Sequence, residues 1–125
     1  AREQVGEHRV VGRHRHRGER LALVQRHHDH AAAAAEGWAE IARRLSEQRH
    51  AFYVLDEFTY PLLRGWVDLD EVLQVLAERP GTQHVIVTGR RAPEALCELA
   101  TTVTEMTKHK HPFDQGQKGQ SGIEW

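Results

Sequence analysis

Two acidic residues, Asp56 and Glu57, directly follow the apolar run 51–55. A carboxylate in this position suits a hard cation, because oxygen is the ligand that Mg²⁺ prefers in proteins. Mg²⁺ commonly accompanies the phosphates of a nucleotide, so the acid pair indicates a nucleotide site. A solvated acid pair that merely ends a strand is the alternative, and the dipeptide alone leaves both interpretations open.

A second polar group, Thr88-Gly89-Arg90, stands at the end of the apolar run 84–88. Glycine permits a tight turn, and arginine can bind phosphate or carboxylate through two parallel hydrogen bonds. The alternative is a surface turn that carries a solvated arginine.

Histidines are concentrated at the other end of the chain, where six of the ten lie within the first 30 residues. This concentration raises another possibility, a histidine-rich metal-binding protein. We do not expect His27, His28 and His30 to share a helical face, and no cysteine supports them, so they do not match an ordinary zinc site. Metal retained in stoichiometric amount after dialysis, and lost when these three residues are changed, would support it.

The elements that must position the acidic and Thr-Gly-Arg groups alternate in type from residue 51 onward. Residues 51–57 and 84–88 are predicted to form buried strands, and residues 102–106 a third, short strand. Helices lie between them, so the order predicts an α/β fold with a parallel sheet flanked by helices. Ligands in such sheets gather at the carboxyl ends of the strands, which is where both polar groups fall.

The helix between the first two strands has the clearest local signals, and we place it at 68–79. Asp68 can cap its first turn, with Glu71 three residues later, and Pro80 and Gly81 follow its end. Its apolar face should comprise Leu69, Val72, Leu73 and Leu76. Residues 58–66 contain proline and glycine and are predicted to form a loop or short helical turn. A further helix beginning at Pro93 should turn three residues inward, namely Leu96, Leu99 and Ala100.

The first half of the chain differs in character from the second. Residues 1–50 carry ten arginines against seven acids, whereas every lysine lies after position 107. Residues 1–18 show no sustained period and are predicted to be irregular. Residues 19–48 could form one helix, because an alanine run is followed by an apolar stripe. That stripe comprises Trp38, Ile41, Ala42 and Leu45.

Bulk properties exclude several classes of protein. The chain has 125 residues and a formal net charge of −1, so one domain is expected, with no nucleic-acid or membrane partner. No apolar run approaches the ~18 residues of a membrane span. Cys97 is the one cysteine and cannot form an internal disulfide. Together with the lack of a visible secretory signal, this predicts a cytoplasmic protein.

Several strings together resemble the ATP:corrinoid adenosyltransferases of cobalamin biosynthesis. They are YVLDEFTYPLLRGWVDLDEVLQVLAERPGTQHVIVTGR at 53–90 and ELATTVTEMTKHKHPFDQGQKGQSGIEW at 98–125, with AAAAAEGWAEIARRL at 31–45 as weaker support. The resemblance covers 51–125 most closely, and its terminal KHPFD…GIE pattern is not a general feature of nucleotide-binding proteins. We therefore divide the chain into a segment 1–30, irregular and rich in His and Arg, and the C-terminal part of an adenosyltransferase domain, 31–125.

The resemblance implies a reaction and a set of ligands. The family transfers the 5′-deoxyadenosyl group of ATP to the Co(I) centre of a reduced corrinoid, and Co(I) is itself the nucleophile, so no catalytic side chain is implied. By motif position, Asp56 and Glu57 would belong to a Mg²⁺ site, in which Mn²⁺ could substitute. The nucleotide-binding residues carried over are Glu57, Tyr60, Arg90 and Lys118. A homodimer and a reductase that supplies Co(I) are the implied partners.

The sequence departs from this family in one respect that matters for ATP. The implied fold is a P-loop NTPase-like sheet, but no G-x-x-x-x-G-K-[ST] string occurs in these residues. We therefore expect a domain truncated at its N-terminus, with weak ATP binding and little activity on its own. The alternative function is a non-catalytic nucleotide- or corrinoid-binding remnant or subunit. An upstream reading frame that encodes the missing motif would favour a split enzyme.

The abrupt change of composition near Ala31 has two interpretations. Residues 1–30 resemble translation of a GC-rich gene in the wrong frame, or they are a divergent N-terminus. Reading the coding DNA in the other two frames separates these interpretations, because only the first predicts family-like strings upstream of codon 31.

Overall fold

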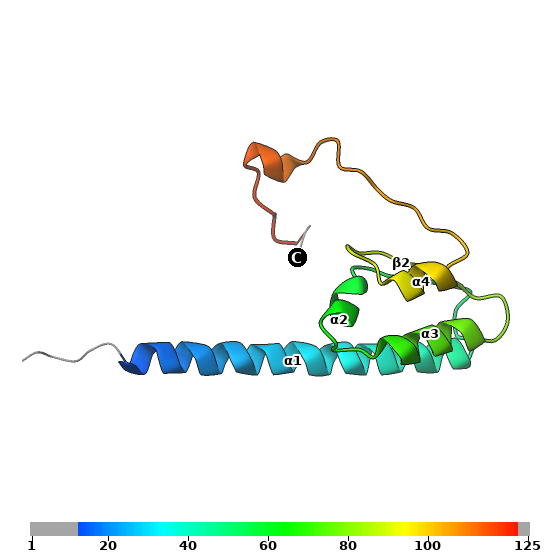
Figure 1. The fold of residues 1–125 in the computed structure, drawn as a ribbon, viewed down its shortest axis with the longest axis horizontal. Coiled ribbons are helices and arrows are strands. Elements are labelled where there is room, and N and C mark those ends of the chain that lie inside the picture. Colours follow the sequence, from blue (N-terminus) through cyan, green and yellow to red (C-terminus); the bar gives the residue numbers. More distant parts are fainter. Residues whose placement is uncertain (1–12, 123–125) are drawn as a thin grey trace, which may run out of the picture.

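A long helix is followed by two short strands and the small helices that connect and cover them (Figure 1). The structure is a computed structural model that describes the backbone of residues 13–122 and the side chains of residues 25–122. In this part of the chain the elements are α1 (Arg13–Ser46), β1 (Phe52–Leu55), α2 (Thr59–Leu63), α3 (Leu69–Glu78), β2 (His84–Val87), α4 (Glu94–Leu99) and the 3₁₀ helix η1 (Pro112–Gln115).

Helix α1 begins earlier than the sequence indicated. The prediction of irregular structure for residues 1–18 was wrong for residues 13–18, which are helical, and the helix continues through the rest of segment 1–30. Residues 1–12 lie outside the described residues. Once a helix is nucleated, each added residue gains a backbone hydrogen bond, so the alanine-rich centre can extend the helix into a segment without apolar periodicity. The division of the chain at residue 31 stays a prediction.

The two strands pair in parallel, which confirms the predicted α/β class with a parallel sheet. The register runs from Phe52 opposite His84 to Leu55 opposite Val87. The prediction that both strands are buried is wrong for one face of β1 and for β2, in which Val85 and Val87 are half-buried and the other two residues are exposed. Side chains alternate across a strand, and Tyr53 and Leu55 are buried whereas their neighbours point to solvent.

No strand forms at residues 102–106 in the described chain, contrary to prediction. A strand needs a neighbour for its backbone hydrogen bonds, and this segment runs past the sheet without pairing. Val103 and Met106 are accordingly exposed, the latter by 91%. The local composition of this short segment was therefore an insufficient signal for a strand.

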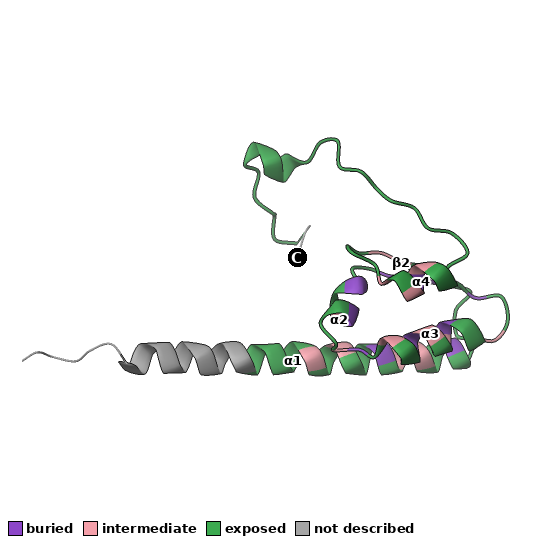
Figure 2. Cartoon of the chain, in the orientation of Figure 1, coloured by how far each residue is buried: buried purple, intermediate pink, exposed green. Residues whose placement is uncertain are grey.

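The core lies between the inner face of the sheet and the helices (Figure 2). Its fully buried members are Leu45 of α1 and Val72 of α3. Trp38 also belongs to it, which confirms its packing role, and the remaining members are Tyr53, Leu55, Phe58, Leu62, Val67, Leu76 and Leu96. In α4, Leu96 is buried as predicted, but Leu99 and Ala100 are exposed, because that helix ends before a second turn can reach the core.

Helix α3 confirms the local signals that predicted it. The Asp68 carboxylate accepts a hydrogen bond from the Glu71 N–H at 2.8 Å and so caps the first turn. The Glu71 carboxylate does not return to the cap; it accepts a hydrogen bond from the Trp38 indole N–H at 3.2 Å. This contact joins α3 to α1 at the border of the core. The short helical turn predicted within 58–66 is also present, as α2.

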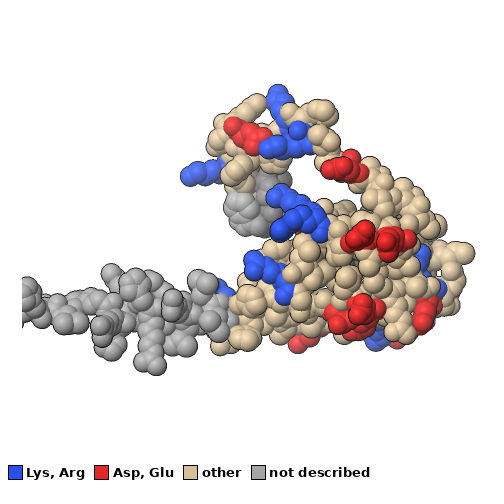
Figure 3. All heavy atoms as spheres, viewed as in Figure 1, with Lys and Arg blue, Asp and Glu red and all other residues tan. Residues whose placement is uncertain are grey.

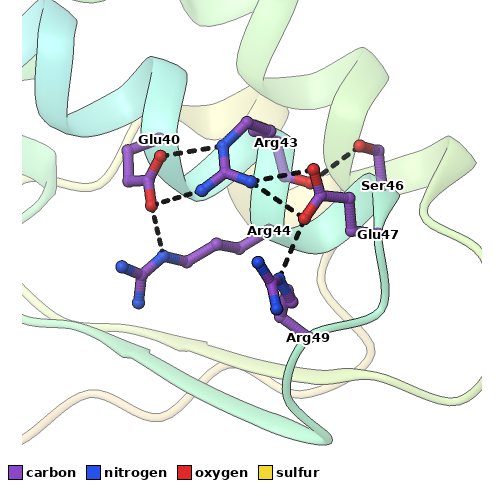
Figure 4. A network of polar contacts seen from close by, with 6 residues as sticks. All are labelled: Glu40, Arg43, Arg44, Ser46, Glu47 and Arg49. Carbon is purple, nitrogen blue, oxygen red and sulfur yellow. Dashed lines mark hydrogen bonds and ion pairs between the residues drawn. The ribbon is translucent and has the colours of Figure 1, made fainter.

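An exposed ion-pair network closes the C-terminal end of α1 (Figure 4). Arg43 lies between two acids, at 2.8 Å from a carboxylate oxygen of Glu40 and 2.8 Å from one of Glu47. Arg44 also contacts Glu40, and Arg49 contacts Glu47. Hydrogen bonds from Arg43 and Arg44 lower the pKa of Glu40 to about 2, and the bond from Arg43 also lowers the pKa of Glu47.

We expect this network to make the end of α1 sensitive to acid. A carboxylate with a lowered folded-state pKa stabilises the fold above its unfolded pKa of 4.5, and that contribution is lost as the pH falls towards about 2. The Glu40→Gln variant should therefore show a smaller loss of helical circular dichroism between these pH values. The effect should be small and should weaken in salt, because the side chains are exposed.

Glu36→Gln is the matched control for that measurement, because Glu36 lies on the same helix and makes no ion pair among the described residues. Its acid transition should match that of the wild type. An unchanged transition in Glu40→Gln would contradict the prediction.

Among the described residues, no helix combines the length and the apolar character that crossing a membrane would require.

Candidate functional site

The carboxyl ends of β1 and β2 lie side by side and bring the two predicted polar groups together. The Thr88 hydroxyl donates a hydrogen bond to the Asp56 carboxylate at 2.6 Å. The same hydroxyl oxygen accepts a hydrogen bond from the Glu57 N–H at 3.0 Å. The Thr88 N–H in turn donates to the Leu55 carbonyl at 3.1 Å. Thr88, which follows β2, therefore fixes the positions of Asp56 and Glu57, the first two residues after β1.

The backbone at Glu57 adopts a conformation that is uncommon for a residue with a side chain. Its φ is +51°, in the left-handed region. Such a conformation costs of the order of 1 kcal/mol and persists where surrounding contacts impose it. Here those contacts are the hydrogen bond to Thr88 and a second one, in which the Glu57 carbonyl accepts from the Tyr60 N–H at 3.0 Å. The turn leaves both acidic residues, Asp56 and Glu57, exposed to solvent.

The loop after β2 is held against the start of α2 by a close approach at Gly89. Thr59 is buried, and its hydroxyl donates a hydrogen bond to the Arg90 carbonyl at 2.9 Å. A Cβ atom at Gly89, whose φ is +147°, would overlap the side chain of Thr59. The sequence predicted a glycine turn here, and the structure adds that glycine is required by contact with a second element.

The joined strand ends offer a hard cation the carboxylate oxygens of Asp56 and Glu57 and the hydroxyl oxygen of Thr88. The described residues contain no group of three or more His, Cys, Asp or Glu side chains that could hold a metal ion. Mg²⁺, however, is usually held by one or two carboxylates and completes its shell with water and substrate phosphates. Two exposed carboxylates with one of them oriented by a hydroxyl fit that arrangement. The donor set therefore suits Mg²⁺ brought with a phosphate ligand.

The structure connects the other predicted site residues less directly to the acid pair. Arg90 follows the close approach at Gly89, and its side chain is exposed. Tyr60 lies in the first turn of α2, but its ring contacts Trp66 and has the Arg64 guanidinium over its face at 5.1 Å. Lys118 lies in the exposed tail beyond η1, and within the described residues no interaction joins it to Asp56 or Glu57.

Two of the three α1 histidines with described side chains pack against a tryptophan. His27 and His30, one turn apart, both lie against Trp66, with ring centroids at 5.2 Å and 6.3 Å. The expectation that His27, His28 and His30 do not share a helical face was wrong for the pair His27 and His30, because residues three apart on a helix are neighbours. Trp66 thus serves as a packing residue. The side chains of His8, His14 and His16 lie outside the described residues.

The C-terminal tail leaves the body of the protein and arches over it (Figure 1). Every residue from 101 to 122 is exposed. Its local order comes from η1, where the His111 imidazole accepts a hydrogen bond from the Phe113 N–H, and from an ion pair of Lys108 with Asp114 at 2.7 Å. Basic and acidic side chains are interspersed on the face shown in Figure 3, without an extended patch of one sign.

The structural roles of two threonines in the site were not foreseen from the sequence. Thr88 was placed at the ligand-binding strand end, but its bridging hydroxyl depends on pairing between residues 32 positions apart. Thr59 was not considered, although it follows the acid pair closely. A small hydroxyl residue after each of two parallel strands is the signal that could have indicated them.

Comparison with known proteins matches this chain to one group. A family model described as ATP:corrinoid adenosyltransferase BtuR/CobO/CobP matches residues 2–125. A corrinoid adenosyltransferase of Escherichia coli strain K12 is 41% identical over 102 residues, which are 82% of this chain and 52% of that protein. One from Pseudomonas aeruginosa is 43% identical over 94 residues, 75% of this chain and 46% of that protein. The corrinoid adenosyltransferase CobA of Salmonella typhimurium is 40% identical over 94 residues, which are 75% of this chain and 48% of that protein. The chain spans about half the length of the curated relatives it matches.

Proposed function

Since the chain belongs to the family of ATP:corrinoid adenosyltransferases, we propose that it takes part in transferring the 5′-deoxyadenosyl group of ATP to the Co(I) centre of a corrinoid in cobalamin biosynthesis. The observation that carries this proposal is the joined end of β1 and β2, where Thr88 holds Asp56 and Glu57 together. This is where a parallel α/β sheet binds its ligands. The proposed fold of the complete domain is P-loop NTPase-like.

Asp56 and Glu57 would hold Mg²⁺ together with the phosphates of ATP. When bound, Mg²⁺ supplies positive charge that stabilises the triphosphate leaving group. Thr88 donates to one oxygen of Asp56 and so restricts the carboxylate, while the second oxygen remains available to a ligand. Prior orientation of this kind reduces the reorganisation needed when the nucleotide binds. No side chain of this site needs to act as a nucleophile, because the attacking atom belongs to the reduced corrinoid.

Arg90, Tyr60 and Lys118 are proposed as further nucleotide contacts. Arg90 is the best supported of them, because it directly follows the Gly89 contact that fixes the loop at the site. A Tyr60 contact would require its ring to leave Trp66, and a Lys118 contact would require the tail to fold towards the sheet. We further propose a homodimer, a reductase that supplies Co(I) and a cytoplasmic setting. These three proposals rest on family membership.

The site should bind Mg·ATP in a way that depends on Asp56. With Mn²⁺ as a paramagnetic substitute, addition of ATP to ¹⁵N-labelled chain should broaden the amide signals of Asp56, Glu57 and Thr88. Asp56→Asn removes a charged oxygen ligand and should weaken binding by about tenfold, which is ~1.4 kcal/mol. Asp70→Asn, which changes an exposed acid of α3 that is not among the assigned site residues, is the control. Broadening that is equal in both variants, or absent with ATP, would refute the assigned site.

These 125 residues alone should adenosylate chemically reduced cobalamin poorly. The sequence has no G-x-x-x-x-G-K-[ST] loop, whose backbone N–H groups and lysine bind phosphates in P-loop proteins. Turnover close to that of the E. coli relative would overturn this expectation. Mg·ATP binding without turnover would instead favour a nucleotide-binding role.

A further inference from the structure

We propose that Arg91 is a second phosphate-binding arginine at the joined strand ends, and that it selects ligands with three linked phosphates over ligands with two. This inference rests on the proposed function, because it deepens the nucleotide site of Asp56 and Glu57. Arg91 lies in the loop between β2 and α4, three residues after Thr88. Its guanidinium recognises the triphosphate, which is the leaving group of the proposed reaction.

The backbone at Arg91 has the same uncommon conformation as the backbone at Glu57. Both residues have a φ of +51°, and among the described residues only Gln48, at +53°, is a further residue other than glycine with a positive φ. Gln48 follows the end of α1, and its N–H donates to the Leu45 carbonyl at 3.1 Å, as in a common way of closing a helix. Glu57 and Arg91 instead lie in the turns after β1 and β2, where a parallel sheet binds its ligands.

No side-chain contact within the described residues accounts for an arginine at this position. The Arg91 side chain is exposed and takes part in no ion pair, hydrogen bond or ring contact there. Glycine adopts a positive φ without the steric penalty of a Cβ atom, so glycine would suit the fold better. Strained residues of this kind are concentrated at ligand-binding sites. The residue type at position 91 therefore favours a role in binding over a role in folding.

The loop fixes the Arg91 backbone on both sides. Before it, the Arg90 carbonyl accepts a hydrogen bond from the Thr59 hydroxyl at 2.9 Å, and Thr59 is 3% exposed. After it, Pro93 stands at the N-cap of α4, and its carbonyl accepts a hydrogen bond from the N–H of the buried Leu96 at 3.0 Å. A long side chain on a fixed backbone loses less freedom when it binds a ligand than one on a mobile loop.

The charged residues at the joined strand ends are two acids and two arginines, and none of the four forms an ion pair with a described residue. The acids, Asp56 and Glu57, suit Mg²⁺, whereas Arg90 and Arg91 suit phosphate oxygens. A phosphate chain that carries its own Mg²⁺ satisfies both pairs. Mg²⁺ neutralises only part of the charge of such a chain, and each added phosphate brings further negative charge. A second guanidinium therefore contributes most when the chain has three phosphates.

The test compares the affinities of the chain for Mg·ATP, Mg·ADP and the Mg²⁺ complex of inorganic triphosphate, each measured by chemical-shift titration of ¹⁵N-labelled protein. Arg91→Gly should weaken binding of ATP and of triphosphate about tenfold, but that of ADP by less than about threefold, because the third phosphate loses a charged partner. Arg91→Lys keeps the charge without the two parallel hydrogen bonds, so its affinity for triphosphate should lie between those of the wild type and Arg91→Gly.

Gln48→Gly is the matched control, because it removes a side chain at nearly the same φ from the end of α1. It should leave all three affinities unchanged. Urea unfolding supplies an independent readout of stability. The midpoint for Arg91→Gly should be no lower than that of the wild type, since glycine relieves the strained backbone. An arginine with a purely structural role would give a lower midpoint when it is removed.

An unchanged affinity in Arg91→Gly, a loss that is equal for ATP and ADP, or the same loss in Gln48→Gly would overturn the proposal. A lower urea midpoint in Arg91→Gly would also overturn it. The proposed function fails in a different way. If Arg91→Gly weakens triphosphate binding but Asp56→Asn does not weaken Mg·ATP binding, the assigned Mg²⁺ site is refuted and the role of Arg91 stands. A wild-type chain that binds none of the three ligands refutes both.

Discussion

Replacing Gly89 with alanine should destabilise the folded chain by about 3 kcal/mol, because two unfavourable effects act at the same position. The φ of +147° at Gly89 is one that side-chain-bearing residues rarely adopt. The added methyl group would also overlap Thr59, which is buried and cannot move away without losing its hydrogen bond to the Arg90 carbonyl. Urea denaturation followed by circular dichroism measures the change in the free energy of unfolding.

Gly65→Ala separates these two effects. Gly65 also has a positive φ, +66°, but a Cβ atom there would meet nothing within 4 Å. This variant should therefore lose only about 1 kcal/mol. If Gly89→Ala lost no more than Gly65→Ala, the close approach to Thr59 would not contribute to stability. The same pair of variants tests the site, because Gly89→Ala should also reduce ATP-dependent broadening at Thr88 and Gly65→Ala should not.

Truncating Leu45 to alanine should cost about 3 kcal/mol of unfolding free energy. The Leu45 side chain is fully buried near the C-terminal end of α1, where it joins that helix to the core. Its removal leaves a cavity in addition to the lost burial of apolar surface. The backbone carbonyl of the same residue accepts a hydrogen bond from Gln83 at 2.8 Å, so the neighbouring backbone is held and the cavity cannot collapse freely. A domain with a small core and one uncovered sheet face has little stability to spare, so we expect the cooperative transition to be lost or strongly shifted.

Leu63→Ala is the matched control for that measurement. Leu63 ends α2 and is 47% exposed, so the same substitution should cost less than ~1 kcal/mol. An equal loss in both variants would mean that α1 is not anchored through Leu45.

Local signals in the sequence were sufficient to predict those elements whose stabilising interactions are themselves local. Helix α3 follows from an N-cap and an apolar face whose members lie three and four residues apart, and the structure confirms both. The two parallel strands, and the acidic residues at the end of β1, follow from short apolar runs and their endings. The motifs that resemble corrinoid adenosyltransferases identified a family that the comparisons confirm.

Other features depended on pairings between distant residues. The hydrogen bond of Thr88 to Asp56 and the contact of Gly89 with Thr59 each join residues about 30 positions apart, so neither has a signature in a local window. The failure of residues 102–106 to form a strand has the same origin, because an extended segment becomes a strand only when a neighbour accepts and donates its hydrogen bonds.

The sequence by itself thus determined the type of most elements, the acidic strand end and the family, since these are encoded in short-range pattern and residue identity. Tertiary structure alone decided which face of the sheet is covered, how Thr88 orients the acid pair and why position 89 must be glycine. Burial and hydrogen bonding are properties of two surfaces in contact, and a single strand or loop provides only one of these two surfaces. The exposed face of the sheet, with Phe52, Val54 and Ile86, is the clearest case, because its apolar residues predicted burial and the described chain supplies no layer to bury them.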